Sequence, residues 1–163
     1  MEIVINKLNK ILFLFSIMSS YDKKYSYLPH TSDIYIVAYG LTLSEAFENA
    51  AEAMFNIITD ISKIHPTNVF KICIRGTDEY NLLYNWLEEL LYLFDTMHLV
   101  FSKFKVYKIE KENSNFILNG EVYGEPFNPT IHKKGREIKS PTYSLMEISR
   151  LNSIYTVKFV LDI

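Results

Sequence analysis

The stretch Ile34-Tyr-Ile-Val-Ala-Tyr-Gly-Leu-Thr-Leu-Ser-Glu-Ala-Phe47 decides the fold, because it holds a strand, a turn and the start of a helix. Residues 34–39 form the short apolar run typical of a buried strand, and Gly40 ends it. Thr42 and Glu45 then have the spacing of a capping box, in which the Thr hydroxyl accepts from a helix amide and Glu45 reaches back to the amide of the cap. A buried strand is therefore expected to lead directly into a capped helix.

Two amphipathic helices are predicted. The first continues to about Ile58, with an apolar stripe at helical spacing made of Leu43, Ala46, Phe47, Ala50, Met54, Phe55 and Ile58. The second begins after Thr77 or Asp78, either of which can cap it. Its stripe is richer in large side chains and consists of Leu83, Trp86, Leu87, Leu90, Leu91 and Phe94. Stripes of this kind indicate helices that are buried against a sheet.

From Phe101 onward the hydrophobic pattern changes to period two, which predicts strands at 101–109, 116–123, 138–148 and 155–162. Asn113-Ser-Asn115 and Leu151-Asn-Ser153 contain residues that tolerate turn conformations, and they predict hairpin connections. Early helices and late strands favour an α+β fold, in which the two principal helices pack on a mostly antiparallel or mixed β-sheet. No internal repeat is visible.

Length and composition are those of one compact domain, since 163 residues with 48% hydrophobic side chains can bury a core. The net charge of −2 gives no basic surface for a phosphate backbone, so any contact with RNA is expected to be indirect, through a partner. The single cysteine, Cys73, indicates a reducing compartment. It lies in a strand-like run, where a buried structural thiol is favoured over a reactive one.

The N-terminal residues 1–20 are predicted to be an extension, with the domain at 21–163. The segment Ile11-Leu-Phe-Leu-Phe-Ser-Ile-Met18 follows two lysines, loosely like a signal peptide, but it is too short to cross a bilayer. A structured extension, a targeting segment, or upstream sequence before a true start at Met18 are the alternatives. Without a membrane segment, the cytoplasm, with the nucleus as a further compartment, is the expected location.

Two carboxylates mark a first candidate site. Asp33 lies in His30-Thr-Ser-Asp33 before the first predicted strand, and Asp162 lies near the end of the last one. An acid at such a position can bind a cation, cap a turn or simply be solvated. If the two strand ends converge, their oxygens suit a hard cation.

A second candidate group packs turn formers, acids, a histidine and a lysine into one stretch, as binding loops often do, and it consists of Gly124-Glu-Pro-Phe-Asn128, His132, and Arg136-Glu-Ile-Lys139 with Thr142-Tyr143. His132 with His30 can suggest a transition-metal site, but no local pair has tight ligand spacing. Lys139 is either an ordinary surface amine or a charge directed at a carboxylate or phosphate.

Several motifs of enzymes are missing from the sequence. There is no glycine-rich phosphate loop, no G-x-S-x-G elbow and no H-E-x-x-H helix. A metal-dependent phosphoester hydrolase that uses Asp33 and Asp162 to activate water remains the alternative class, but only His30 and His132 are available as a general base. A generic chaperone of nucleic acids or proteins is a third class.

The ordered set of motifs resembles the archease family over roughly residues 25–163. The stretches that carry the resemblance are His30-Thr-Ser-Asp-Ile34, Gly40-Leu-Thr-Leu-Ser-Glu-Ala-Phe47, Ala50-Ala-Glu-Ala-Met-Phe55, Leu82-Leu-Tyr-Asn-Trp-Leu-Glu-Glu-Leu-Leu91, Gly124-Glu125 with His132, Glu137-Ile-Lys139 with Thr142-Tyr143, and Leu161-Asp-Ile163. The resemblance implies an α+β fold and a non-enzymatic accessory protein that activates the tRNA-splicing RNA ligase, promoting its guanylylation and multiple turnover.

The resemblance also implies roles for individual residues. Asp33 and Asp162 match metal-binding aspartates, and Ile163 matches a ligand that uses its carbonyl oxygen. The implied ion is Ca²⁺, although Mn²⁺ or Mg²⁺ also suit an oxygen site. Lys139 matches a lysine implicated in activation, and His30, Glu125 and His132 accompany it as residues expected to act on the partner.

The sequence departs from the family pattern at a few positions. Ser32 stands in place of Ala, Tyr35 in place of Gly, and Asn128 where Asp is common. Ser140-Pro141 replaces a small apolar pair, and Pro141 removes one backbone donor. These differences bear on loop geometry near the candidate site.

Overall fold

The computed structural model describes residues 23–163, so the predicted extension at 1–20 lies outside the described residues. The chain forms, in order, β1 (Tyr25–Leu28), β2 (Ile34–Gly40), α2 (Leu43–Ile58), a short 3-10 helix η1 (Ile61–Lys63), β3 (Asn68–Gly76), α3 (Glu79–Met97), β4 (Leu99–Glu112), β5 (Asn115–Pro126), β6 (Ser140–Leu151) and β7 (Ile154–Asp162). The predicted α+β class and both predicted helices are confirmed.

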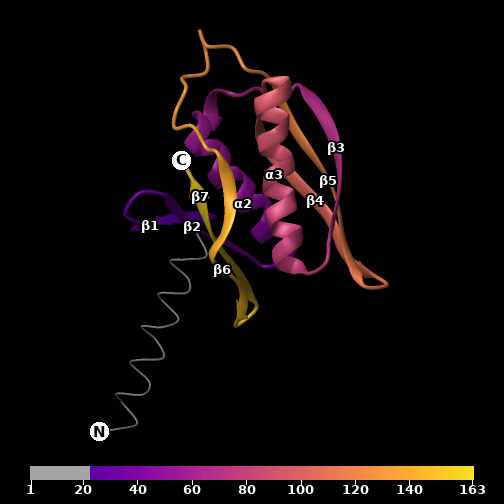
Figure 1. Cartoon of the computed structure of the whole chain (residues 1–163). Coiled ribbons are helices and arrows are strands. Elements are labelled where there is room, and N and C mark those ends of the chain that lie inside the picture. Colours follow the sequence, from indigo (N-terminus) through magenta and orange to yellow (C-terminus); the bar gives the residue numbers. More distant parts are fainter. Residues whose placement is uncertain (1–22) are drawn as a thin grey trace, which may run out of the picture.

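The strands form two antiparallel sheets, where the sequence analysis expected one. One sheet has the order β1-β2-β7-β6 and the other has the order β3-β5-β4. Both helices lie between them: α2 contacts β2 and β4, and α3 contacts β6 and β3. Figure 1 shows β3, β4 and β5 on one side of the helix pair, with β1, β2, β6 and β7 on the other. Each helix thus buries apolar residues against both sheets, and the core lies between the layers.

The helix starts follow the predicted capping chemistry, with one difference in detail. The Thr42 hydroxyl accepts from the Glu45 amide at 3.0 Å, as predicted. The Glu45 carboxylate, however, accepts from the amide of Leu41 at 2.6 Å, one residue before the cap. The start of α3 repeats this arrangement, with Asp78 accepting from the amide of Asn81 at 2.7 Å and the Asn81 side chain accepting from the preceding turn. Each helix is therefore closed at its N-terminus by two side-chain bonds.

The late strands and hairpins are confirmed, with longer bounds for most of the strands. Leu151 pairs with Ile154 around a two-residue turn, whose Asn152 and Ser153 have positive φ of 48° and 70°. Such φ values match the twist of a tight hairpin. The predicted strand at 138–148 starts later, at Ser140, and its register shifts between Thr142 and Glu147.

Cys73 corrects one prediction, because its side chain is exposed and not buried. It lies on the edge strand β3, where Ile72 and Ile74 face the helices and are at most 8% exposed. Successive side chains of a strand point to opposite faces, so Cys73 projects from the uncovered face of the sheet. An apolar run on an edge strand does not reveal which face is covered.

Among residues 23–163, none of the helices has the length and apolar character that crossing a membrane requires.

Candidate functional site

Asp33 and Asp162 are brought together by the register of two strands. β2 and β7 pair antiparallel with Ile34 opposite Leu161, so Asp33 and Asp162 occupy the next facing positions at the end of the ladder. Facing residues in an antiparallel pair project from the same face of the sheet. Leu161 is fully buried, and the two carboxylates therefore leave the sheet on the face opposite to this core residue. The sequence separation of the two acids is thus bridged by one strand pairing.

Lys139 and Ile163 join the same strand ends. The amide of Lys139 donates to the carbonyl of Asp162 at 2.8 Å, directly before β6 begins its pairing with β7. The Lys139 ammonium donates to the backbone oxygen of Ile163 at 2.9 Å and lies 3.8 Å from Asp162 Oδ1. The side chains of Lys139 and Asp162 are 65% and 45% exposed, so this group stands open to solvent. We call Asp33, Lys139, Asp162 and Ile163 the strand-end group.

His30 borders the strand-end group on the β1–β2 connection. Its Nδ1 accepts from the backbone amide of Asp33 at 3.3 Å, which orients the ring and leaves Nε2 as the protonated nitrogen of the neutral form. The ring also meets Tyr35 edge to face, with centroids 6.4 Å apart. The bulky Tyr35, a departure from the family pattern, is therefore accommodated as a wall for His30.

The donors of the strand-end group fit a hard cation better than zinc. Its available ligand atoms are carboxylate and backbone oxygens, which Ca²⁺, Mg²⁺ and Mn²⁺ prefer. In the part of the chain that the structure describes, no three His, Cys, Asp or Glu side chains are grouped as a metal site. Two carboxylates and one backbone oxygen leave most coordination positions of such an ion to water or to a partner's atoms.

Glu125 and His132 lie in a different cluster, which is closed on itself. Glu125 Oε1 accepts from the amide of His65 at 2.7 Å and lies 3.1 Å from His65 Nδ1 and 3.2 Å from His132 Nε2. The other ring nitrogen of His132 accepts from the amide of Asn128 at 2.9 Å. His132 is 1% exposed. Both of its ring nitrogens are engaged, so the structure does not join it with His30 in a transition-metal site.

Hydrogen bonding holds Glu125 in its ionised form. The backbone amide of His65 is the main cause that lowers the pKa of Glu125, and the side chains of His65 and His132 add to it, while burial opposes it. A carboxylate that accepts several hydrogen bonds is stabilised in its charged form. We call Glu125, His132, His65 and Asn128 the closed cluster. Its hydrogen bonds stabilise the turn that follows β5.

The loop from 133 to 136 closes the C-terminal end of α2. The Thr59 hydroxyl donates to the carbonyl of Lys133 at 2.8 Å, and the amides of Gly135 and Arg136 donate to the carbonyls of Ile58 and Ile57 at 2.7 and 3.0 Å. The Ile57 and Ile58 carbonyls are among the four that a helix end leaves without intrahelical partners. A Cβ at position 135 would lie 2.1 Å from the Ile57 oxygen, so only glycine permits this approach.

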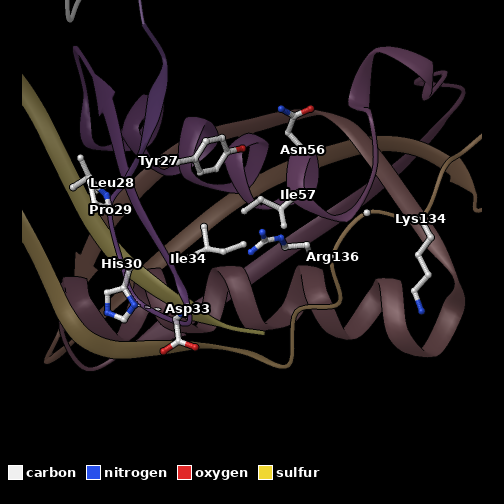
Figure 2. A pocket seen from close by; sticks show the side chains of 11 residues that line it. Tyr27, Leu28, Pro29, His30, Asp33, Ile34, Asn56, Ile57, Lys134 and Arg136 are labelled. Carbon is white, nitrogen blue, oxygen red and sulfur yellow. Dashed lines mark hydrogen bonds between the residues drawn. The ribbon is translucent and has the colours of Figure 1, made fainter.

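A pocket of about 600 Å³ opens between this loop and the β1–β2 connection. Figure 2 shows the Arg136 side chain reaching into it near Ile34 and Ile57, while Lys134 points away. The pocket is lined by Tyr27, Leu28, Pro29, His30, Asp33, Ile34, Asn56, Ile57, Lys134, Gly135 and Arg136. Asp33 thus lines this pocket and is also a member of the strand-end group. Arg136 belongs to the second candidate group of the sequence, but no role was predicted for it, although the basic run Lys133-Lys-Gly-Arg136 was a usable signal.

The comparisons with known proteins agree with this architecture. A model of the archease protein family (MTH1598/TM1083) matches residues 25–163. The archease of Methanosarcina acetivorans is 42% identical over 146 residues, covering 90% of this chain and all of the relative. The archease of Pyrococcus furiosus is 46% identical over 129 residues, covering 79% of this chain and 90% of the relative.

Two solved structures share the fold. The solution structure of Methanobacterium thermoautotrophicum protein 1598 superimposes with a TM-score of 0.77 at 37% identity, covering 86% of this chain and 99% of that one. An archease from Thermotoga maritima, described as a possible chaperone, has a TM-score of 0.52 at 17% identity over 83% of this chain and 94% of that one, which supports the fold alone. With a family match that spans nearly all described residues, the chain belongs to the archease family.

Proposed function

We propose that this protein is a metal-binding accessory protein that activates the tRNA-splicing RNA ligase. In this role it promotes guanylylation of the ligase and its multiple turnover during exon joining, in the cytoplasm or nucleus, and it performs no chemistry itself. Membership of the archease family supports an accessory role. The net charge of −2 favours contact with RNA through the ligase and not directly.

The observation that carries the proposal is the convergence of Asp33 and Asp162 at one end of the β2–β7 ladder, beside Ile163. These oxygens would hold a divalent cation, with Ca²⁺ the preferred candidate and Mn²⁺ or Mg²⁺ as substitutes. When bound, the ion would supply positive charge that can bridge to oxygens of the partner. Because the group is exposed, a surface of the ligase can reach it directly.

The chain's own residues would position this contact. Lys139 bonds the Ile163 oxygen and lies near Asp162, so it presents an ammonium on the same surface as these oxygens. His30 orients the backbone at Asp33. Glu125 and His132, which we also expect to affect activation, would act by holding the loop that leads to Lys139.

The test is ligase guanylylation and ligation under multiple turnover with substoichiometric amounts of this protein. Asp33→Asn and Asp162→Asn should lose most of the stimulation, because each removes a charged oxygen ligand without changing side-chain size. Asp95→Asn, an exposed carboxylate on α3, is the matched control and should stimulate as the wild type does.

Two outcomes would reject the proposal. Folded Asp33→Asn and Asp162→Asn proteins that stimulate the ligase fully would remove the role of the strand-end group. Turnover of a phosphate ester by the purified chain alone, abolished by a chelator and by Asp33→Asn, would instead favour the metal-dependent hydrolase.

A further inference from the structure

The pocket beside the strand-end group contains a cation with no partner within residues 23–163. The backbone of Arg136 is fixed by its amide bond to the Ile57 carbonyl, and the guanidinium lies in the pocket near Ile34 and Ile57. No hydrogen bond or ion pair of the described residues engages that guanidinium. Lys134, by contrast, points out of the pocket and lies 3.9 Å from Glu137. Arg136 is an exposed residue, and its guanidinium at the wall of the pocket offers a planar fork of donors to an anion.

His30 adds a second donor at the same pocket. Because its Nδ1 accepts from the Asp33 amide, the proton of the neutral ring sits on Nε2. The Asp33 carboxylate points away from the Arg136 guanidinium (Figure 2). The pocket lining therefore combines two donors with a carboxylate that forms no ion pair with the arginine.

The rest of the lining is mostly apolar. Leu28, Pro29, Ile34 and Ile57 contribute hydrocarbon surface, and the ring of Tyr27 is fixed by its hydroxyl, which donates to the Ala53 carbonyl at 3.0 Å. Ligand pockets of a few hundred cubic ångströms typically pair such apolar walls with a few convergent polar groups. A ligand that matches has an anionic end and an organic body about the size of a nucleotide.

We propose that this pocket binds a phosphate ester of nucleotide size, with the phosphate on Arg136 and His30 and the organic group against Tyr27, Leu28 and Pro29. A phosphate has oxygens for the arginine fork and further oxygens for a divalent ion. This matters here because Asp33 borders both sites. An ion held by Asp33 and Asp162 can therefore be shared with the phosphate, and this sharing rests on the metal site of the proposed function.

The experiment is calorimetric titration of the full chain with adenosine 5′-monophosphate, with inorganic phosphate and with adenosine, each in Ca²⁺ and in a chelator. The monophosphate should bind more tightly than either fragment, and Ca²⁺ should strengthen its binding. Arg136→Met should lower the affinity for the monophosphate about 10- to 100-fold, which is the range expected when hydrogen bonds to a charged group are lost. Lys108→Met removes a surface lysine that lies outside the pocket, and its affinity should equal that of the wild type.

Two further variants separate the parts of the proposal. Arg136→Lys keeps the charge and loses the fork, so it should recover only part of the affinity while keeping the wild-type melting temperature. Asp162→Asn should abolish the effect of Ca²⁺ and leave binding in the chelator unchanged.

Equal affinity of wild type and folded Arg136→Met protein for the monophosphate would overturn the proposal. So would a glutamate-rich peptide that displaces the monophosphate and binds more tightly, since the pocket would then be a docking site for an acidic protein segment. A wild-type chain that binds no phosphate ester yet stimulates the ligase would reject the pocket and leave the proposed function standing.

Discussion

The closed cluster and the strand-end group both contain carboxylates but present them in opposite ways. In the closed cluster, Glu125 accepts from two histidines and His132 is buried with both ring nitrogens bonded. In the strand-end group, Asp162 is nearly half exposed and its nearest cation, Lys139, is an exposed side chain. The first arrangement uses its polar atoms to hold a loop, and the second keeps them available. Carboxylates of one chain can therefore serve two purposes: some stabilise a loop, and others stay accessible to a ligand.

The largest expected effect comes from opening the closed cluster. His132→Ala removes a buried ring and leaves Glu125 and the Asn128 amide short of partners, so it should lower the free energy of unfolding by about 2–4 kcal/mol. Urea denaturation measures it. His30→Ala, an exposed histidine, is the matched control and should change stability by only about 0.5 kcal/mol. If the two variants lost equal unfolding free energy, His132 would be no more important for stability than an exposed histidine, which would contradict the role of the closed cluster.

The next effect concerns cation affinity. Asp33→Asn and Asp162→Asn should each weaken Ca²⁺ binding by more than about 10-fold. Mutating a residue that only hydrogen-bonds to a metal ligand already lowers affinity by about that factor, so losing a charged ligand should cost at least as much. Their unfolding free energies should stay close to the wild type, because both aspartates are only partly buried and neither carboxylate bonds a buried group. Calorimetry with Asp95→Asn as control measures the affinity. Unchanged Ca²⁺ binding in both variants would leave the strand-end group without a metal role.

A smaller effect of opposite sign is expected from Lys139→Met. The Lys139 ammonium donates to the Ile163 oxygen and lies 3.8 Å from Asp162 Oδ1. Because these oxygens would also hold the ion, the ammonium should compete with a cation for them. An exposed ion pair is worth up to about 1 kcal/mol, so removing it should strengthen Ca²⁺ binding by up to about fivefold. Lys108→Met, which removes another surface lysine paired to a glutamate, should have no effect. Weaker binding in Lys139→Met would show that the lysine supports the ion and does not compete with it.

The smallest effect should appear at acidic pH in the closed cluster. The pKa of Glu125 is lowered below its usual 4.5, mainly by the His65 amide, so its stabilising contribution is complete above about pH 4.5 and is lost as pH falls through the lowered value. The difference in melting temperature between wild type and Glu125→Gln should therefore shrink below pH 4.5. A difference that stays constant down to pH 3 would contradict this assignment.

Local signals in the sequence predicted much of the fold. The Thr42 cap and the asparagine turns depend on contacts within a few residues, and both appear as expected. The meeting of Asp33 and Asp162 was implied by the family resemblance, since no local pattern specifies that β2 pairs with β7.

Contacts between distant segments were the part that residues alone did not predict. The side of β3 that carries Cys73 depends on which face the helices cover. The pocket exists because Gly135 and Arg136 bond the end of α2, far away in sequence. His65 reaches Glu125 across the fold in the same way. Each of these depends on tertiary packing that hydrophobic periodicity does not encode.

The position of Trp86 has a practical consequence for all of these measurements. It is the only tryptophan, it is fully buried, and its indole nitrogen donates to the Phe47 carbonyl of the other helix at 3.1 Å. Its fluorescence should therefore report separation of α2 from α3 during unfolding. Since it lines neither the pocket nor the strand-end group, its emission gives a stability signal that added calcium or nucleotide should not disturb directly.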